Sequence, residues 1–255
     1  MLLVLDIGNT NIKTGLFRNG VLIYSWRLAT NMSRTSDEYG VQMESFFGHL
    51  GLETAEVTGI IMSSVIPSMN YTIERMCEIY FHHLPVMLVS PKLNLGIDIS
   101  YDYPDQLGTD RICNSVAAYR TYGGPCIAVD FGTATNFCVI SEQGKFMGGL
   151  ICPGLMISAD ALIDKTAMLH KVEYIKPRNV VCTNTKDAIQ AGVIYGYVGQ
   201  VDYIIGQIER ESKMDFKVIA TGGMSGMIAS ETNTIDTVNP TLTLEGLAMI
   251  YELNA

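Results

Sequence analysis

Asp6-Ile7-Gly8-Asn9-Thr10 recurs 124 residues later as Asp130-Phe131-Gly132-Thr133-Ala134. A short apolar run precedes each copy, at residues 2–5 and 126–129, and a second apolar run follows it, at residues 12–17 and 136–140. Each second run leads to a hairpin glycine, Gly20 or Gly144, which keep the same spacing. Self-similarity at a fixed interval indicates a duplicated unit, here a strand, a glycine-bearing turn and a returning strand.

The composition is that of a protein with much apolar surface to bury. The chain has 255 residues, of which 48% are hydrophobic. This is enough for one large core or for two cores of about 120 residues each. Charged residues make up only 17%, below the ~25% of an average domain, and the mean hydropathy is +0.22. We therefore expect an oligomer.

Several classes of protein are disfavoured. No apolar run approaches the ~20 residues of a membrane span, and Asp6 interrupts the first run, so a cytoplasmic protein without a membrane partner is expected. The net charge is −9 and no Lys/Arg cluster exists, which argues against a nucleic-acid partner. The six cysteines form no C-x-x-C pair and the four histidines no ligand spacing, so the cysteines are interpreted as structural thiols.

The first half reads as alternating strands and helices. Asn19-Gly20 is typical of a hairpin turn, and Thr35-x-x-Glu38 is a capping box that predicts a helix over 36–50. Further along the chain, the patterns predict a strand from Thr58 to Ile66, stopped by Pro67, and a helix after it. A strand from Val86 to Ser90 and a polar loop from Asp98 to Gly108 follow. A helix is then expected from Gly108 to Gly123-Gly124. We place the boundary between halves near residue 120, giving domains 1–120 and 121–255.

The second half opens with the repeated unit and continues with helices. A helix holding Leu155, Leu162 and Leu169 is expected after Pro153-Gly154, and the longest helix is expected from about Thr185 to Glu211. Gly192, Gly196 and Gly199 lie on one face of that helix, which predicts close helix packing. The remaining expected elements are a strand at 216–220, a glycine-rich loop at 221–226 that resembles a nucleotide-contact loop, a strand at 235–238 and a helix with Leu244, Leu247, Ala248 and Tyr251 on one face.

The first repeated turn has the chemistry of a phosphate site. Gly8 lets backbone N–H groups approach a phosphate, and Asn9 and Thr10 add side-chain donors. Asp6 is suited to hydrated Mg²⁺, and Lys13 supplies positive charge for a polyphosphate. The competing interpretation is an ordinary hairpin with a polar turn, and the repetition favours the phosphate site.

Two such hairpins with a late glycine-rich loop resemble the duplicated α/β ribonuclease-H-like (actin-like ATPase) fold of actin, the Hsp70 chaperones and sugar kinases. In that fold two similar domains hold ATP in the cleft between them. The order D-I-G-N-T-N-I-K at 6–13, G-T-D-R at 108–111, D-F-G-T-A at 130–134 and T-L-E-G-L at 243–247 resembles the type III pantothenate kinases over the whole chain.

This resemblance implies phosphoryl transfer from ATP to the primary hydroxyl of pantothenate, the first step of coenzyme A synthesis. It implies ATP and Mg²⁺ at Asp6, Ile7, Gly8, Asn9, Thr10, Asn11, Ile12, Lys13 and Thr133. It also implies a monovalent cation, K⁺ or NH₄⁺, at Asp130, where the wider superfamily suggests a second Mg²⁺ contact instead.

By the same resemblance, Asp110 is the general base, and the pantothenate site comprises Tyr101, Gly108, Thr109, Asp110, Arg111 and Thr185. Asp110 starts a helix whose dipole favours its ionised form, and Arg111 suits a carboxylate. Other interpretations stay open: Asp110 as a residue that stabilises its own helix, Asp102 or Asp105 as the base, Tyr101 as a loop anchor and Thr185 as an N-cap. Position 109 departs from the family pattern, in which many members carry a smaller residue. A homodimer that completes the pocket is also implied.

Three other functions compete with this one. The first is a kinase of the same fold that acts on another primary alcohol, such as a sugar. The second is an ATP-driven activator with an iron–sulfur cluster between subunits, for which Cys152 is the candidate ligand. The third is an accessory factor for transcription, which the missing basic patch disfavours. The chain also lacks G-x-x-x-x-G-K-[ST], so a P-loop kinase is excluded.

Overall fold

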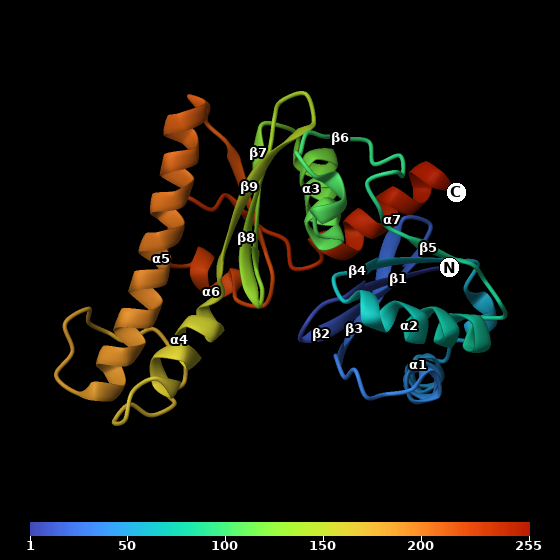
Figure 1. The fold of residues 1–255 in the computed structure, drawn as a ribbon, viewed down its shortest axis with the longest axis horizontal. Coiled ribbons are helices and arrows are strands. Elements are labelled where there is room, and N and C mark those ends of the chain that lie inside the picture. Colours follow the sequence, from blue (N-terminus) through green and yellow to red (C-terminus); the bar gives the residue numbers. More distant parts are fainter. The chain divides into compact units, whose positions relative to one another are not determined.

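The computed structural model describes residues 1–255 and divides them into two compact units. Unit 1 comprises Met1–Ala117 with Thr241–Ala255, and unit 2 comprises Ala118–Pro240. The sequence prediction put the C-terminal helix in the second half, whereas the structure packs it in unit 1, against the first sheet (Figure 1). Unit 1 is therefore discontinuous in sequence.

The first sheet has the order β3-β2-β1-β4-β5. Its strands are β1 (Leu2–Ile7), β2 (Asn11–Arg18), β3 (Val21–Ala29), β4 (Gly59–Ser64) and β5 (Val86–Leu88). β1 to β3 form an antiparallel meander, while β4 and β5 run parallel to β1. The predicted Asn19-Gly20 turn is confirmed, since both residues have positive φ, 52° and 76°, as a two-residue hairpin of this twist requires.

Helices cover both faces of this sheet (Figure 1). On one face lie α1 (Ser36–His49), which has the predicted capping box, and α2 (Pro67–Tyr80), which begins at the proline that ends the strand run. On the other face lies α7 (Leu242–Asn254). The core beneath α1 and α2 contains Leu3, Leu5, Ile7, Ile12, Leu16, Tyr39, Met43, Phe47, Ile73 and Phe81, all nearly inaccessible.

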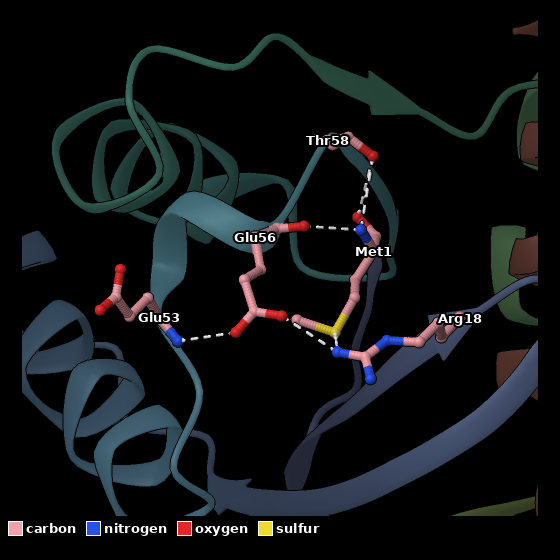
Figure 2. Close-up of polar contacts among 5 residues, drawn as sticks. All are labelled: Met1, Arg18, Glu53, Glu56 and Thr58. Carbon is pink, nitrogen blue, oxygen red and sulfur yellow. Dashed lines mark hydrogen bonds and ion pairs between the residues drawn. The ribbon is translucent and has the colours of Figure 1, made fainter.

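Polar contacts tie the start of the chain to the segment that enters β4 (Figure 2). The Met1 nitrogen donates to the Glu56 carbonyl oxygen at 2.6 Å, and the Met1 carbonyl oxygen accepts from the Thr58 N–H at 2.8 Å. Arg18 pairs with the Glu56 carboxylate at 3.0 Å, and that carboxylate also accepts from the Glu53 N–H at 3.2 Å. These contacts fix the register of β1 against β4 at the end remote from Asp6.

The rest of unit 1 leads into α3 (Thr109–Tyr122), which crosses into unit 2. The predicted loop from Asp98 to Gly108 is mostly irregular but contains a two-residue strand, β6 (Asp98–Ile99), and a short 3₁₀ turn, η2 (Pro104–Gln106). Another 3₁₀ turn, η1 (Thr54–Glu56), precedes β4. No helix of the chain combines the length and hydrophobicity needed to cross a bilayer.

Unit 2 repeats the meander of unit 1. Its strands run in the order β11-β10-β7-β8-β9, with bounds β7 (Cys126–Phe131), β8 (Ala134–Ile140), β9 (Lys145–Pro153), β10 (Lys217–Thr221) and β11 (Thr237–Val238). β10 and β11 lie parallel to β7. The helices are α4 (Leu155–Asp164), α5 (Thr185–Ser212) and the short α6 (Ser225–Ala229). Apolar residues of α5, among them Ile194, Val198, Val201 and Ile205, pack on the sheet.

One prediction for unit 2 was wrong. The helix that begins at Leu155 ends at Asp164, so Leu169 lies outside it in an irregular stretch that extends to α5. A Cβ placed on Gly192, Gly196 or Gly199 of α5 would meet no atom within 4 Å, so this face has no close partner within the chain, and its predicted close packing stays a prediction. The spacing of glycines along a helix shows which face carries them, but not which element packs on that face.

Candidate active site

The first phosphate hairpin joins β1 to β2 through a closed turn. The Gly8 N–H donates to the Asn11 carbonyl oxygen at 3.1 Å, and the Thr30 hydroxyl donates to the Gly8 carbonyl oxygen at 2.6 Å. A side chain on Gly8 would crowd this turn, because its Cβ would lie 3.0 Å from the Asn11 oxygen. The turn thus presents Asn9 and Thr10 to solvent while its backbone stays fixed.

Asp6 and Lys13 lie opposite each other at the mouth of this hairpin. They are register partners across β1 and β2, and Lys13 Nζ lies 3.4 Å from Asp6 Oδ2. Asp6 is only 4% exposed. Of the other predicted ATP contacts, Ile7 and Ile12 place their side chains in the core, so they could contact a nucleotide only through their backbone.

The start of α3 is held by the hydroxyl of Thr109. Its Oγ1 lies 2.9 Å from Ser63 Oγ, accepts from the Ser64 N–H at 3.0 Å and donates to the Ser64 carbonyl oxygen at 3.1 Å. Ser63 is in turn the register partner of Asp6 in parallel β4. The departure at position 109 therefore has a structural role: the threonine connects the helix start to the strand beside the phosphate hairpin.

Asp110 follows in the first turn of α3. Its Oδ1 accepts the Arg111 N–H at 2.8 Å and lies 2.5 Å from the position that a Cβ on Gly108 would take. A side chain at position 108 would therefore displace the Asp110 carboxylate from its present place. Asp102 and Asp105, the alternative bases, lie exposed in the preceding loop.

Arg111 and Tyr101 are brought together, although ten positions separate them in sequence. The guanidinium carbon of Arg111 lies 5.9 Å from the centre of the Tyr101 ring, within range of a cation–π contact. Arg111 is only 4% exposed. The phenol ring therefore helps to orient a nearly buried cation beside Asp110.

The carboxylates of Asp6 and Asp110 both influence the thiol of Cys113, which lies one turn into α3. Burial raises the pKa of the Cys113 thiol well above its usual value, and the negative charges of Asp6 and Asp110 raise this pKa further. Both carboxylates are thus close enough to act on one thiol. The contact between Thr109 and Ser63, the register partner of Asp6, likewise brings the helix start close to the first hairpin.

The T-L-E-G-L motif, at residues 243–247 of α7, packs against helix α3. Thr243 donates to Asn114 Oδ1 at 2.8 Å, and a Cβ on Gly246 would lie 2.0 Å from the Cys113 carbonyl oxygen. Helix α7 therefore approaches the backbone of α3 too closely for any side chain at position 246. Sequence reasoning found Thr243 to Leu247 only as a family motif and missed Ser63 and Asn114, whose roles depend on register and on contacts distant in sequence.

The second phosphate hairpin is similar but not identical. Three residues separate β1 from β2, whereas two separate β7 from β8. The register is shifted in consequence, and Asp130 faces Asn136 where Asp6 faces Lys13. The duplicated aspartates thus have different surroundings: Asp6 has a cation opposite it and Asp130 an amide.

The glycine-rich loop closes over this hairpin. Gly222 has φ +93°, and a Cβ there would lie 2.5 Å from Asp130 Oδ1 and 2.6 Å from the Phe131 carbonyl. Ser225 fixes the loop by donating its hydroxyl to the Gly222 carbonyl oxygen at 2.7 Å. Asp130 is 8% exposed, and Thr133 is exposed at the turn.

Thr185 is exposed at the first position of α5. The interpretation of Thr185 as N-cap was wrong, since the cap is Asn184, whose Oδ1 accepts the Asp187 N–H at 2.9 Å. No hydrogen bond joins Thr185 to another candidate site residue.

The carboxylates fit metal ions that are held partly by other ligands. No three side chains of His, Cys, Asp or Glu converge on one point. Mg²⁺ in phosphoryl-transfer sites is usually held by one or two carboxylates together with substrate phosphates and water, which a single nearly buried carboxylate such as Asp6 suits. The six cysteines are free, and Cys152 is half-buried in β9.

The chain is similar to a known family of proteins over most of its length. A family model described as type III pantothenate kinase matches residues 2–207. A type III pantothenate kinase of Halalkalibacterium halodurans is 46% identical over 254 residues, 100% of each chain. One of Bacillus cytotoxicus is 48% identical over 255 residues, 100% of this chain and 97% of the relative.

A solved structure shares the fold. It is component A of the (R)-2-hydroxyglutaryl-CoA dehydratase of Acidaminococcus fermentans, with a TM-score of 0.56 at 12% identity, covering 98% of this chain and 96% of that one. The likeness confirms the duplicated ribonuclease-H-like fold that the two hairpins predicted.

Proposed function

Because this chain belongs to the type III pantothenate kinase family, and so phosphorylates pantothenate in the first step of coenzyme A synthesis, we propose that Asp110 is the general base of the reaction. The observation that supports this proposal is the contact of 2.9 Å between Thr109 Oγ1, beside Asp110 at the start of α3, and Ser63 Oγ, whose residue is the register partner of Asp6. The sugar-kinase, iron–sulfur and transcription alternatives are disfavoured by this membership.

In the proposed reaction, the primary hydroxyl oxygen of pantothenate attacks the γ-phosphorus of ATP, and the bond from that phosphorus to the β–γ bridging oxygen breaks. ADP leaves, and the hydroxyl proton passes to the Asp110 carboxylate. The transition state is loose, so proton acceptance is late and orientation matters more than basicity. Two features support this role: the helix N-terminus stabilises the ionised carboxylate, and the Arg111 N–H holds one of its oxygens.

ATP is proposed to bind across the first hairpin at Asp6 to Lys13, with Thr133 as a contact from the second hairpin. The Gly8 turn is held in place by its own hydrogen bonds, and the charge of Lys13 suits phosphate oxygens. Mg²⁺, held through water by Asp6, would neutralise charge on the β- and γ-phosphates.

Pantothenate is proposed to bind at Tyr101, Gly108, Thr109, Asp110, Arg111 and Thr185. Arg111 would pair with its carboxylate, since a guanidinium matches a carboxylate in two-pronged fashion. The contact between Arg111 and the Tyr101 ring supports this role by limiting the orientations of the guanidinium.

We also propose that Asp130 binds a monovalent cation, K⁺ or NH₄⁺. Its support is the environment of the carboxylate, which is nearly buried, enclosed by the Gly222 loop and opposite Asn136 rather than a lysine. A monovalent cation is suited to this site because the register partner of the carboxylate is a neutral amide.

A homodimer in the cytoplasm is the proposed assembly. Its support is the open glycine face of α5, beside a groove of about 410 Å³ between α4 and α5 lined by Leu155, Leu162, Ile189 and Val193. A second copy of α5 could approach this face closely. Gly196→Leu should give a smaller species in sedimentation, because its side chain would occupy that space.

The test of Asp110 is ADP release with ATP, Mg²⁺ and pantothenate, measured in K⁺ and in Na⁺ buffer. Asp110→Asn should lower kcat at least ~100-fold, as expected for the loss of a general base. Asp105→Asn, an exposed carboxylate five residues earlier in the chain, is the matched control and should keep full activity. Retention of turnover by Asp110→Asn would exclude it as the base. Equal rates in K⁺ and Na⁺ would remove the cation role of Asp130.

A further inference from the structure

A row of polar side chains crosses the first sheet at the phosphate hairpin. Asp6 in β1 pairs in register with Ser63 in β4 on one side and with Lys13 in β2 on the other, and Lys13 pairs with Arg27 in β3. Residues directly opposite one another on neighbouring strands share a face of the sheet. The four side chains therefore lie on one face, with Arg27 on the edge strand.

Arg27 has a cation opposite it and no partner of its own. Like charges directly opposite each other on adjacent strands are destabilising. Lys13 is paired with the Asp6 carboxylate, whereas Arg27 is exposed and makes no hydrogen bond or ion pair. The row carries one negative and two positive charges in a chain whose net charge is −9. An anion beside Lys13 and Arg27 would offset this repulsion.

The position of Arg27 relative to the phosphate turn is fixed by the backbone. Thr30, three residues further along, donates its N–H to the Thr10 carbonyl oxygen at 3.0 Å and its hydroxyl to the Gly8 carbonyl oxygen at 2.6 Å. The end of β3 is thus bonded to the turn that cradles phosphate. The regular pairing between Asn11 and Leu16 places Arg27 beside Lys13 without a bulge.

From this geometry we propose that Arg27 is a second cation for the phosphate chain of the nucleotide, acting beside Lys13. Its fork of N–H donors binds phosphate oxygens in two-pronged fashion, which a lysine cannot do. The inference deepens the proposed function and rests on the first hairpin as the ATP site. It assigns Arg27 to the triphosphate and not to the carboxylate of the second substrate.

The test compares Arg27→Gln, which removes the charge, with Arg27→Lys, which keeps it. The control is Arg120→Gln, an exposed arginine ten residues beyond Asp110 near the end of α3. Arg27→Gln should raise the KM for ATP about tenfold or more, as expected for one lost charge-assisted hydrogen bond, and leave the KM for pantothenate unchanged. Arg27→Lys should recover part of the loss, and Arg120→Gln should match the parent protein.

Binding is measured separately by calorimetry with a non-hydrolysable Mg-ATP analogue and with inorganic tripolyphosphate, both without pantothenate. Arg27→Gln should weaken both ligands and leave adenosine binding unaffected. An unchanged affinity for tripolyphosphate, or a rise in KM for pantothenate alone, would overturn the proposal. Because these titrations need no second substrate, a failure of the pantothenate kinase assignment remains distinguishable from a failure of Arg27.

A measurement on the unaltered protein covers the case in which Arg27→Gln fails to fold. Modification of arginines by phenylglyoxal, followed by peptide mapping, reports the accessibility of Arg27 itself. Tripolyphosphate should slow modification of Arg27 and not of Arg120, and adenosine should slow neither. Equal rates at Arg27 with and without tripolyphosphate would refute the proposed contact.

Discussion

Gly246→Ala should destabilise unit 1 and impair catalysis together. The new Cβ would lie 2.0 Å from the Cys113 carbonyl oxygen and 2.6 Å from its carbon, both backbone atoms that no rotamer change can move. An ordinary contact requires the two helices to separate by roughly 1.4 Å. Helix α3 carries Asp110 and Arg111, so any separation displaces both.

The magnitude follows from two opposing effects. Overpacking of this kind costs typically 1–3 kcal/mol, and the upper end, about 3 kcal/mol, applies where the obstacle is backbone. Replacing a helical glycine by alanine stabilises the helix by up to ~1 kcal/mol. The expected net loss is about 2 kcal/mol. Gly48→Ala in α1 is the control, because its Cβ would meet nothing within 4 Å. It tests the gain in helix propensity alone and should stabilise the protein by up to ~1 kcal/mol.

The assay is urea unfolding followed by the fluorescence of Trp26, the single tryptophan, which stacks on Phe46 at 5.2 Å between ring centres within unit 1. Gly246→Ala should lower the midpoint at unchanged slope, which indicates a loss of stability rather than a change in the surface exposed. Its kcat should fall even under conditions in which the variant is fully folded. If the unfolding free energies of Gly246→Ala and Gly48→Ala agreed within ~0.5 kcal/mol, the argument from close helix approach would be refuted.

Three further predictions concern other parts of the chain. Thr109→Val removes the hydroxyl that contacts Ser63 and Ser64, so it should lower the stability of unit 1 by about 2 kcal/mol and also lower kcat. Thr109→Ser keeps a hydroxyl and should restore both quantities. Equal kcat values for the two variants would contradict a positioning role. Gly222→Ala would place a side chain at φ +93° and put its Cβ 2.5 Å from Asp130 Oδ1. It should lower the unfolding free energy of unit 2 by about 2 kcal/mol in chemical unfolding. Gly223→Ala, whose Cβ would have open space around it, should leave this free energy unchanged. Burial raises the pKa of Cys77 from 9.0 to about 12, so the unfolded chain loses this proton first and stability should fall between pH 9 and about 12. The slope per buried thiol is about 1.4 kcal/mol per pH unit, and Cys77→Ala should make the measured decline shallower; an unchanged slope would exclude the thiol as its source.

The local elements of the fold were predictable because their signals are local. The capping box at Thr35 and Glu38, the Asn19-Gly20 turn and the proline at the start of α2 each act within a few residues, and all were confirmed. The helix expected through Leu169 failed because apolar spacing continues past Asp164 although the helix does not.

The parts of the site that sequence could not supply depend on register and distant packing. A turn one residue shorter in the second hairpin puts Asn136 rather than a lysine opposite Asp130, and the gapless alignment of the two copies conceals this difference. Thr109 was recognised only as a departure from a pattern, because its three contacts lie 45 and 46 positions earlier in the chain. The packing of α7 on unit 1 joins segments separated by the whole of unit 2.

The discontinuity of unit 1 bears on how the protein is synthesised. A ribosome completes Ala118–Pro240, a contiguous unit, before it adds the last helix that unit 1 requires. The sheet of unit 1 is therefore synthesised long before the helix that covers one of its faces. Unit 1 can complete its packing only after α7 has been made. A chain truncated shortly before Thr241 would therefore lack the helix that packs against α3 at Cys113.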